Sequence, residues 1–292
     1  MDLPGDMAFR DLADVDRMKA LRGTGARCVV IGGGLLGLEA AYGLARLGLE
    51  TTLLHVMDKL MERQLDRRAA AIVRKTMESK GVRVVLQADT AKIVGDGRVE
   101  ALHLADGTVI PADLVVVAVG VRPRVDLARE AGLAVGRGIQ VDDALATSDP
   151  SVFAIGECAE HRGTVYGLVE PGYEMADVLA RRLAGQARTY PGSTVATSLK
   201  VSGLPVFSAG EIADEAGGEP ILLSDPVRGI YRKLVVKEGR LAGALLIGDV
   251  GEGAWYRELI ESRATIAAIR HELMFGRVDI PPADAEQARM AA

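Results

Sequence analysis

The sequence predicts an α/β protein built around a parallel sheet, and three observations predict this fold class. A short apolar strand leads directly into a glycine-rich turn and then a helix over residues 28–47. Strand and helix patterns alternate over residues 28–87, which is typical of βαβ units. Finally, Leu114–Val119 is continuously apolar, as expected of a strand covered on both faces of its sheet.

The alternating region follows a lead-in segment. Residues 1–26 are predicted to contain a helix, because Leu12, Val15, Met18 and Leu21 recur at helical spacing. Each of the next two helices should end at a glycine, which favours a helix C-terminus. The elements predicted here are a strand at 28–31, a helix at 35–47, a strand at 50–56 and a helix at 66–80.

Turn signals divide the next part of the chain into short strands. Gly95–Gly97 and Asp106-Gly107 predict a small antiparallel meander, after which the chain returns to the buried strand. The strands predicted here are 82–87, 91–94, 99–104 and 114–119.

Residues beyond 120 first mix turns with one helix near 173–183, and a second group of strands follows. The tail after Pro281 is Ala-rich and polar, and we expect it to be frayed. The later elements predicted are strands at 198–201, 206–209, 231–237 and 241–247, and helices at 255–261 and 264–274.

Composition excludes several classes of function. A net charge of −5 argues against a nucleic-acid or acidic-membrane surface, because both need a basic patch. No apolar run approaches the roughly 18 residues that would predict a membrane span, and the acidic N-terminus lacks a signal core, so we expect a cytoplasmic protein. The two cysteines, Cys28 and Cys158, form no Cys-x-x-Cys pair or Cys/His cluster, so neither a thiol redox couple nor a metal site is expected.

The glycine-rich turn carries the main functional signal. Residues Gly32-Gly33-Gly34-Leu35-Leu36-Gly37 form a G-x-G-x-x-G pattern between a predicted strand and a predicted helix, which is the context of a dinucleotide-binding fingerprint. Gly32 allows the tight turn, Gly34 lets the backbone approach a pyrophosphate, and Gly37 lets helix and strand pack closely. The phosphates would then face free N–H groups at the helix N-terminus.

The end of the second strand should show which nicotinamide cofactor binds. An NAD site usually places an acidic residue there, but this chain has His55, with Asp58 three residues later. No Arg stands at that position to demand a 2′-phosphate, although Arg63 is near in sequence. NADH is therefore modestly favoured over NADPH, and His55 is either a cofactor-binding residue or a simple strand-end residue.

Three further segments resemble the pyridine nucleotide-disulfide oxidoreductase family of FAD-dependent flavoproteins. They are Ala118–Pro123, Asp149–Ala159 and Gly167–Ala176. Together with Leu54–Arg63 and Ser198–Gly210, they are most similar to the flavoprotein portion of the large subunit of NAD(P)H-dependent assimilatory nitrite reductases, over about residues 8–275.

The resemblance implies cofactors and roles for particular residues. FAD would meet Val119, Gly120, Gly156 and Glu157, where Glu157 replaces the usual Asp but can still accept hydrogen bonds. Glu39 would lie near the contact between nicotinamide and flavin, or else be a solvated first-turn residue favoured by the helix dipole. NADH would pass hydride to the flavin, which needs no catalytic acid–base pair.

The same resemblance implies an incomplete flavoprotein. Only one glycine fingerprint is present, and its position marks it as the nicotinamide one, so roughly a hundred residues of an FAD half would precede Met1. We therefore expect a Rossmann-like nicotinamide-binding domain, a partial second dinucleotide (FAD) domain and a C-terminal α+β domain. The expected boundaries are a lead-in at 1–26, the NAD(P)H domain at 27–117, the FAD part at 118–195, the interface domain at 196–276 and a tail at 277–292.

Two classes of function remain open from the sequence. The first is an FAD-dependent NAD(P)H reductase that supplies a sirohaem and Fe–S nitrite reductase centre or, alternatively, a rubredoxin or ferredoxin. The second is a nucleotide-binding module without turnover. A homodimer is possible through apolar strands of the C-terminal domain.

Overall fold

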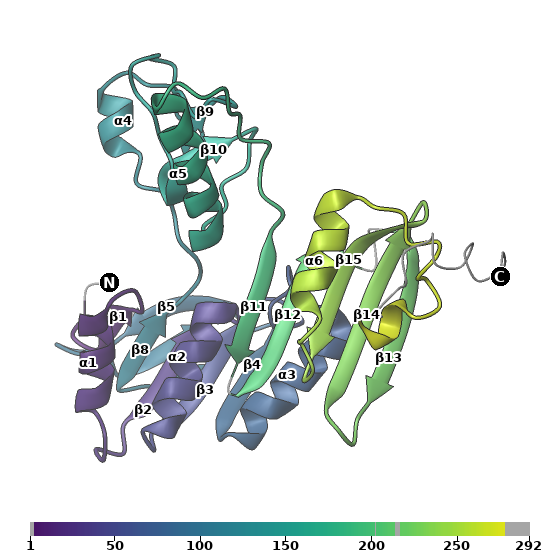
Figure 1. The fold of residues 1–292 in the computed structure, drawn as a ribbon. Helices are drawn as coiled ribbons and strands as arrows, with labels where there is room; N and C mark the ends of the chain where they lie inside the picture. The colour runs from purple at the N-terminus through teal and green to yellow at the C-terminus, as the bar shows by residue number, and fades with distance from the viewer. Residues whose placement is uncertain (1–2, 202, 214–216, 278–292) are drawn as a thin grey trace, which may run out of the picture. The chain divides into compact units, whose positions relative to one another are not determined.

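The computed structural model describes residues 3–201, 203–213 and 217–277, and these fall into two compact units (Figure 1). One unit joins the chain up to Val119 with the chain from Ala196 onward, and the other is Gly120–Val195. The tail expected after Pro281 lies outside the described residues.

A five-stranded parallel sheet forms the base of the first unit. Its order is β1 (Asp6–Ala8), β8 (Leu114–Val117), β2 (Arg27–Ile31), β3 (Glu50–His55) and β4 (Val82–Leu86). The lead-in segment thus contributes a strand that was not predicted, because three residues are too few to show a period. Since β8 and β3 flank β2 on opposite sides, the strand order reverses at β2.

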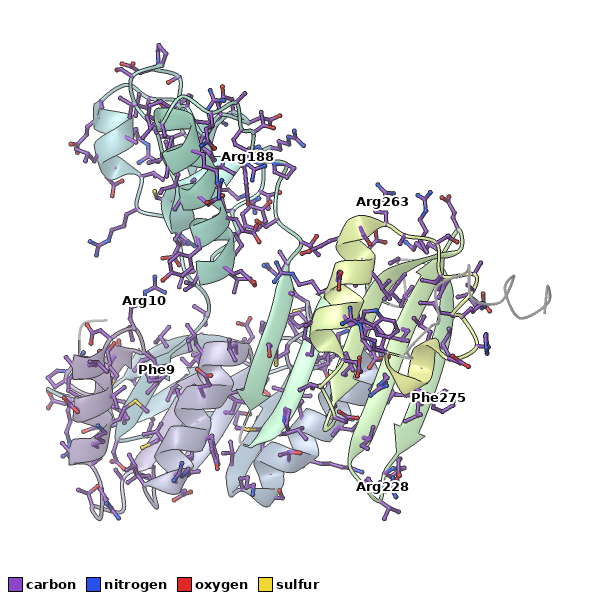
Figure 2. The ribbon with its side chains drawn as sticks, in the orientation of Figure 1. Phe9, Arg10, Arg188, Arg228, Arg263 and Phe275 are labelled. Atoms are coloured by element: carbon purple, nitrogen blue, oxygen red, sulfur yellow. The ribbon has the colours of Figure 1, made fainter. Side chains whose placement is uncertain are left out.

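Helices cover one face of this sheet, and the sequence sets where they begin and end. The helices are α1 (Leu12–Ala20), α2 (Leu35–Arg46) and α3 (Arg67–Ser79). Asp11 and Asp66 cap α1 and α3 through their carboxylates, whereas α2 begins at Gly34 without a side-chain cap. Phe9 and Arg10, marked in Figure 2, connect β1 to α1.

The predicted antiparallel meander covers the other face. It consists of β5 (Thr90–Val94), β6 (Ala101–Leu104) and an unpredicted third strand, β7 (Val109–Pro111). Val29 and Val115 share a core cluster with the meander, while Val30 and Val116 share one with the helices. Because successive strand residues face opposite sides, this explains why β2 and β8 are apolar without alternation.

The rest of the first unit is a five-stranded antiparallel sheet. Its order is β11 (Ala196–Val201), β12 (Leu204–Gly210), β15 (Arg240–Ile247), β14 (Ile230–Lys237) and β13 (Glu219–Asp225), and β13 was not predicted. One face packs against the helical side of the parallel sheet, and the other against α6 (Gly253–Ser262) (Figure 1).

The predicted helix at 264–274 is wrong. Those residues form a bridge at Thr265, turns and a single 3-10 turn, η3 (Leu273–Phe275), and Arg263, the C-cap that follows α6, has a left-handed conformation. Ile266, Leu273 and Met274 are buried against the sheet in this irregular form. Their apolar spacing therefore reflects packing of turns on a sheet rather than a helical face.

A buried polar cluster joins the antiparallel sheet to α3. The Tyr231 hydroxyl on β14 donates to Asp66 Oδ2 at 2.6 Å, and Lys233 Nζ lies 3.5 Å from the same oxygen. Lys233 Nζ also donates to the Ile212 carbonyl at 2.9 Å. Because Asp66 also caps α3 by accepting the Ala69 N–H, one buried carboxylate serves both the helix and the interface.

The second unit is smaller and has its own core. It contains α4 (Asp126–Glu130), β9 (Ile139–Val141), the 3-10 turn η1 (Gly156–Cys158), β10 (Ala159–His161) and α5 (Val169–Leu183). The two strands are parallel. Helix α5 begins four residues earlier than predicted, with Pro171 in its first turn, where the missing N–H leaves no helical bond unmade.

None of the helices among the described residues is both long enough and apolar enough to span a bilayer.

We expect Tyr231→Phe to lower the free energy of unfolding by about 1–2 kcal/mol, because it removes a buried hydrogen bond to a carboxylate and keeps the ring. Urea denaturation followed by circular dichroism measures this. Tyr42→Phe on α2 is the control, since the Tyr42 hydroxyl forms no hydrogen bond with the residues that the structure describes. Equal stability of the two variants would contradict a role for the Asp66 cluster in holding the sheets together.

Stability should also depend on pH through Asp113. Hydrogen bonds from Arg27 hold the pKa of this carboxylate at about 2. Because the folded pKa is depressed, Asp113 stabilises the fold above its unfolded pKa of about 3.9, and this contribution is lost as pH falls toward 2. We expect the stability difference between wild type and Asp113→Asn to shrink between pH 6 and pH 2.5. An unchanged difference would refute the assignment.

Candidate functional site

The glycine-rich turn lies at the carboxyl end of β2, where the strand order reverses. Gly32 follows β2 directly with φ +118°, a conformation that favours glycine. A Cβ atom on Gly32 would lie 2.3 Å from the carbonyl oxygen of Ala118, which follows β8. The turn can therefore pass β8 only because residue 32 has no side chain. Ligands of open α/β sheets bind at this point.

The other two glycines of the pattern differ in what surrounds them. A Cβ on Gly37 would lie 1.8 Å from the Gly32 carbonyl oxygen, so close packing of α2 on β2 requires glycine there. A Cβ on Gly34 would meet no protein atom within 4 Å. The packing of the protein therefore does not require glycine at position 34. The space beside this residue is open, and this is the residue where the fingerprint pattern predicts a pyrophosphate.

The start of α2 suits an anion. Gly34 is the N-cap, and it offers no side-chain acceptor to the N–H groups of Leu35, Leu36 and Gly37 in the first turn. The first N–H groups of a helix have no partner within the helix, and the helix dipole favours negative charge beside them. The residues present therefore fit the diphosphate of a dinucleotide.

Glu39 lies farther along α2 with an exposed side chain. Partial burial of its carboxyl group raises its pKa above the ordinary value. The suggested position near a nicotinamide stays a prediction.

His55 at the end of β3 is buried and held within the protein. Its Nδ1 accepts the Gly33 N–H at 3.0 Å, and its Nε2 lies 3.1 Å from Glu62 Oε2. Both ring nitrogens are thus engaged, and this arrangement leaves neither for a ribose hydroxyl. Asp58, the acidic residue three positions after His55, forms an ion pair with Arg67 at 2.7 Å.

Glu62 was missed by sequence reasoning. It lies in the loop that joins β3 to α3, seven residues after His55, and its side chain is one-third exposed. No periodic pattern or motif marks a carboxylate in an irregular loop, so the contact with His55 could be found only in three dimensions.

The residues suggested for FAD divide between the two units. Val119, which is 70% exposed, is the last residue of the first segment of the first unit. Gly120, with φ +112°, is the first residue of the second unit. Gly156 and Glu157 begin η1 in the second unit, and the Gly156 N–H donates to Met175 Sδ of α5 at 3.3 Å. A Cβ on Gly172 of α5 would lie 3.4 Å from Gly156 Cα, so this turn packs closely on the helix. Their contacts with FAD stay predictions.

Across the described residues, His, Cys, Asp and Glu nowhere gather in a group of three or more that could hold a metal ion. Cys28 is buried in the parallel sheet, where burial raises the pKa of its thiol to about 12.

The chain is similar to known proteins over most of its length. Over 267 residues the chain is 46% identical to a nitrite reductase (NAD(P)H) of Bacillus subtilis strain 168, covering 91% of this chain and 33% of that protein. An assimilatory nitrate reductase electron transfer subunit of the same organism is 41% identical, covering 85% of this chain and 32% of that protein. The chain thus spans about a third of the length of these curated relatives.

Solved structures and family profiles extend the match. A NAD-dependent persulfide reductase from A. fulgidus superposes with a TM-score of 0.82 at 29% identity, covering 97% of this chain and 56% of that one. Residues 196–264 match the C-terminal domain of rubredoxin NAD+ reductase. Residues 1–178, more than half of the chain, match the profile of the pyridine nucleotide-disulphide oxidoreductases. The chain therefore belongs to the pyridine nucleotide-disulphide oxidoreductase family.

Proposed function

We propose that the chain is part of an FAD-dependent NADH oxidoreductase that delivers electrons to a nitrite reductase centre. The observation that carries the proposal is the turn at Gly32–Gly37. There the N-terminus of α2 has no side-chain cap, the space at Gly34 is open, and the strand order of the sheet reverses. The name of the nitrite reductase relative from Bacillus subtilis supports the choice of acceptor, and the name of the second relative, an electron transfer subunit, supports a role in electron delivery.

In this proposal the chain's own residues bind and orient the cofactors. The turn at Gly32–Gly37 binds the NADH diphosphate, and Glu39 lies toward the nicotinamide. Val119, Gly120, Gly156 and Glu157 contact FAD. When bound, the nicotinamide supplies a hydride that the flavin accepts and releases as single electrons.

A second candidate acceptor is a rubredoxin or ferredoxin. The match of residues 196–264 to the C-terminal domain of rubredoxin NAD+ reductase favours it. Measuring NADH-dependent reduction of a rubredoxin, a ferredoxin and a nitrite reductase haem domain in parallel separates the two candidates, because the true acceptor should be reduced fastest.

The first test is the flavin content of the purified protein. We expect a flavin absorbance spectrum and reduction of ferricyanide by NADH at a higher rate than by NADPH. A colourless protein that binds NADH but reduces nothing after FAD is added would refute reductase activity of this chain by itself and leave it a nucleotide-binding module.

A second prediction concerns Gly34. Asp is a favoured N-cap residue and position 34 has open space, so Gly34→Asp should fold normally. Its carboxylate would occupy and repel the site of the diphosphate, so we expect NADH affinity to fall at least about tenfold, equivalent to about 1.4 kcal/mol. Isothermal titration calorimetry measures the affinity.

The matched control is Gly43→Asp, which makes the same charge change in the same helix at another open position. It should leave NADH binding unchanged. Equal loss in both variants would show that the effect is not specific to the turn.

A further inference from the structure

Gly33 is the one glycine of the turn that the G-x-G-x-x-G pattern leaves unexplained, because it occupies a position where any residue is allowed. A Cβ atom there would lie 2.5 Å from Cγ of the His55 ring and 2.8 Å from a methyl carbon of Leu60. Glycine is therefore needed so that the imidazole can pack directly on the peptide backbone of the turn.

Both backbone groups of Gly33 are bound by residues at the end of β3 and in the loop that follows it. Its N–H donates to His55 Nδ1 at 3.0 Å, and its carbonyl oxygen accepts the Met61 N–H at 3.0 Å. Met61 is buried with φ +49°, a conformation that side chains rarely adopt. A strained residue in contact with the turn indicates that the surrounding packing holds this segment in one conformation.

The hydrogen bonds also determine the tautomer of His55. A backbone N–H can only donate, so Nδ1 must be the unprotonated ring nitrogen. The proton is then on Nε2, which donates to the Glu62 carboxylate at 3.1 Å. A carboxylate partner at one nitrogen orients the ring and fixes which nitrogen carries the proton, as in histidines that bind metals.

We propose that His55 is a positioning residue for the dinucleotide-binding turn, and that Glu62 keeps it in the tautomer which accepts the Gly33 N–H. The pair holds the peptide that connects Gly32 to the N-cap Gly34 and so maintains the first turn of α2 in a shape ready for a diphosphate. His55 thus occupies the strand-end position that an acidic residue takes in other NAD sites, but its role is different. The part of this proposal that concerns NADH rests on the function proposed above.

Long-range ¹H–¹⁵N spectra of the imidazole rings test the geometry without a cofactor. We expect His55 to show the tautomer protonated at Nε2 and the Gly33 amide to exchange slowly with solvent. In Glu62→Leu, which has no acceptor for the Nε2 proton, a second tautomer should appear, whereas in Glu62→Gln the amide oxygen can still accept this proton and the single tautomer should remain. A wild-type ring protonated at Nδ1, or a rapidly exchanging Gly33 amide, would overturn the proposal whether or not NADH binds.

Variants of His55 test the consequence for binding. Asn can place its side-chain oxygen where Nδ1 lies, so His55→Asn should keep NADH affinity within about threefold of wild type, while His55→Leu, which has no acceptor, should lose about tenfold. His271→Leu, at an exposed histidine, is the control and should change nothing. Circular dichroism and thermal melting monitor the fold of each variant.

The outcomes separate the two proposals. Equal losses in the Asn and Leu variants, or no loss in either, would overturn the positioning role. If wild type itself fails to bind NADH, the proposed function fails, and the tautomer and the Gly33 exchange rate still decide whether His55 holds the turn.

Discussion

The close passage of the glycine turn over the ends of β2 and β8 is the constraint on which the rest of the first unit depends. Gly32 approaches the Ala118 carbonyl, and Gly37 approaches Gly32, at distances that exclude any side chain. These contacts place the start of α2 at the point where the strand order reverses. The N–H groups of the first helical turn therefore lie beside the open space at Gly34. The arrangement that suits an anion therefore follows from backbone sterics, and no charged side chain is needed to produce it.

The loop between β3 and α3 is fixed at both of its ends. His55, the last residue of β3, and Met61 within the loop bind the backbone groups of Gly33, and at the end of the loop Asp66 caps α3 and accepts a hydrogen bond from the Tyr231 hydroxyl. The antiparallel sheet is thus connected to the glycine-rich turn at Gly32–Gly37 through one short segment of chain. Buried polar groups need hydrogen-bond partners, and because Gly33 and Tyr231 lie on other elements than this segment, these hydrogen bonds join the elements.

Much of the fold was predictable because it depends on local patterns. Apolar runs, glycine stops and turn residues placed β2, α2, β3 and α3 within one or two residues. Prediction failed where packing outweighs pattern. Strand β1 is too short to show a period, and residues 264–274 bury apolar side chains in turns rather than on a helical face.

At the candidate site, the glycine spacing was enough to predict the turn, because it expresses steric limits of the backbone that operate within a few residues. The partners of the His55 ring, in contrast, depend on the tertiary structure. The position of His55 predicted a cofactor contact, but the fold brings Gly33 to one ring nitrogen and Glu62 to the other. Hydrogen bonds between segments separated by a helix or an irregular loop depend on how those segments pack, and no local pattern records that arrangement.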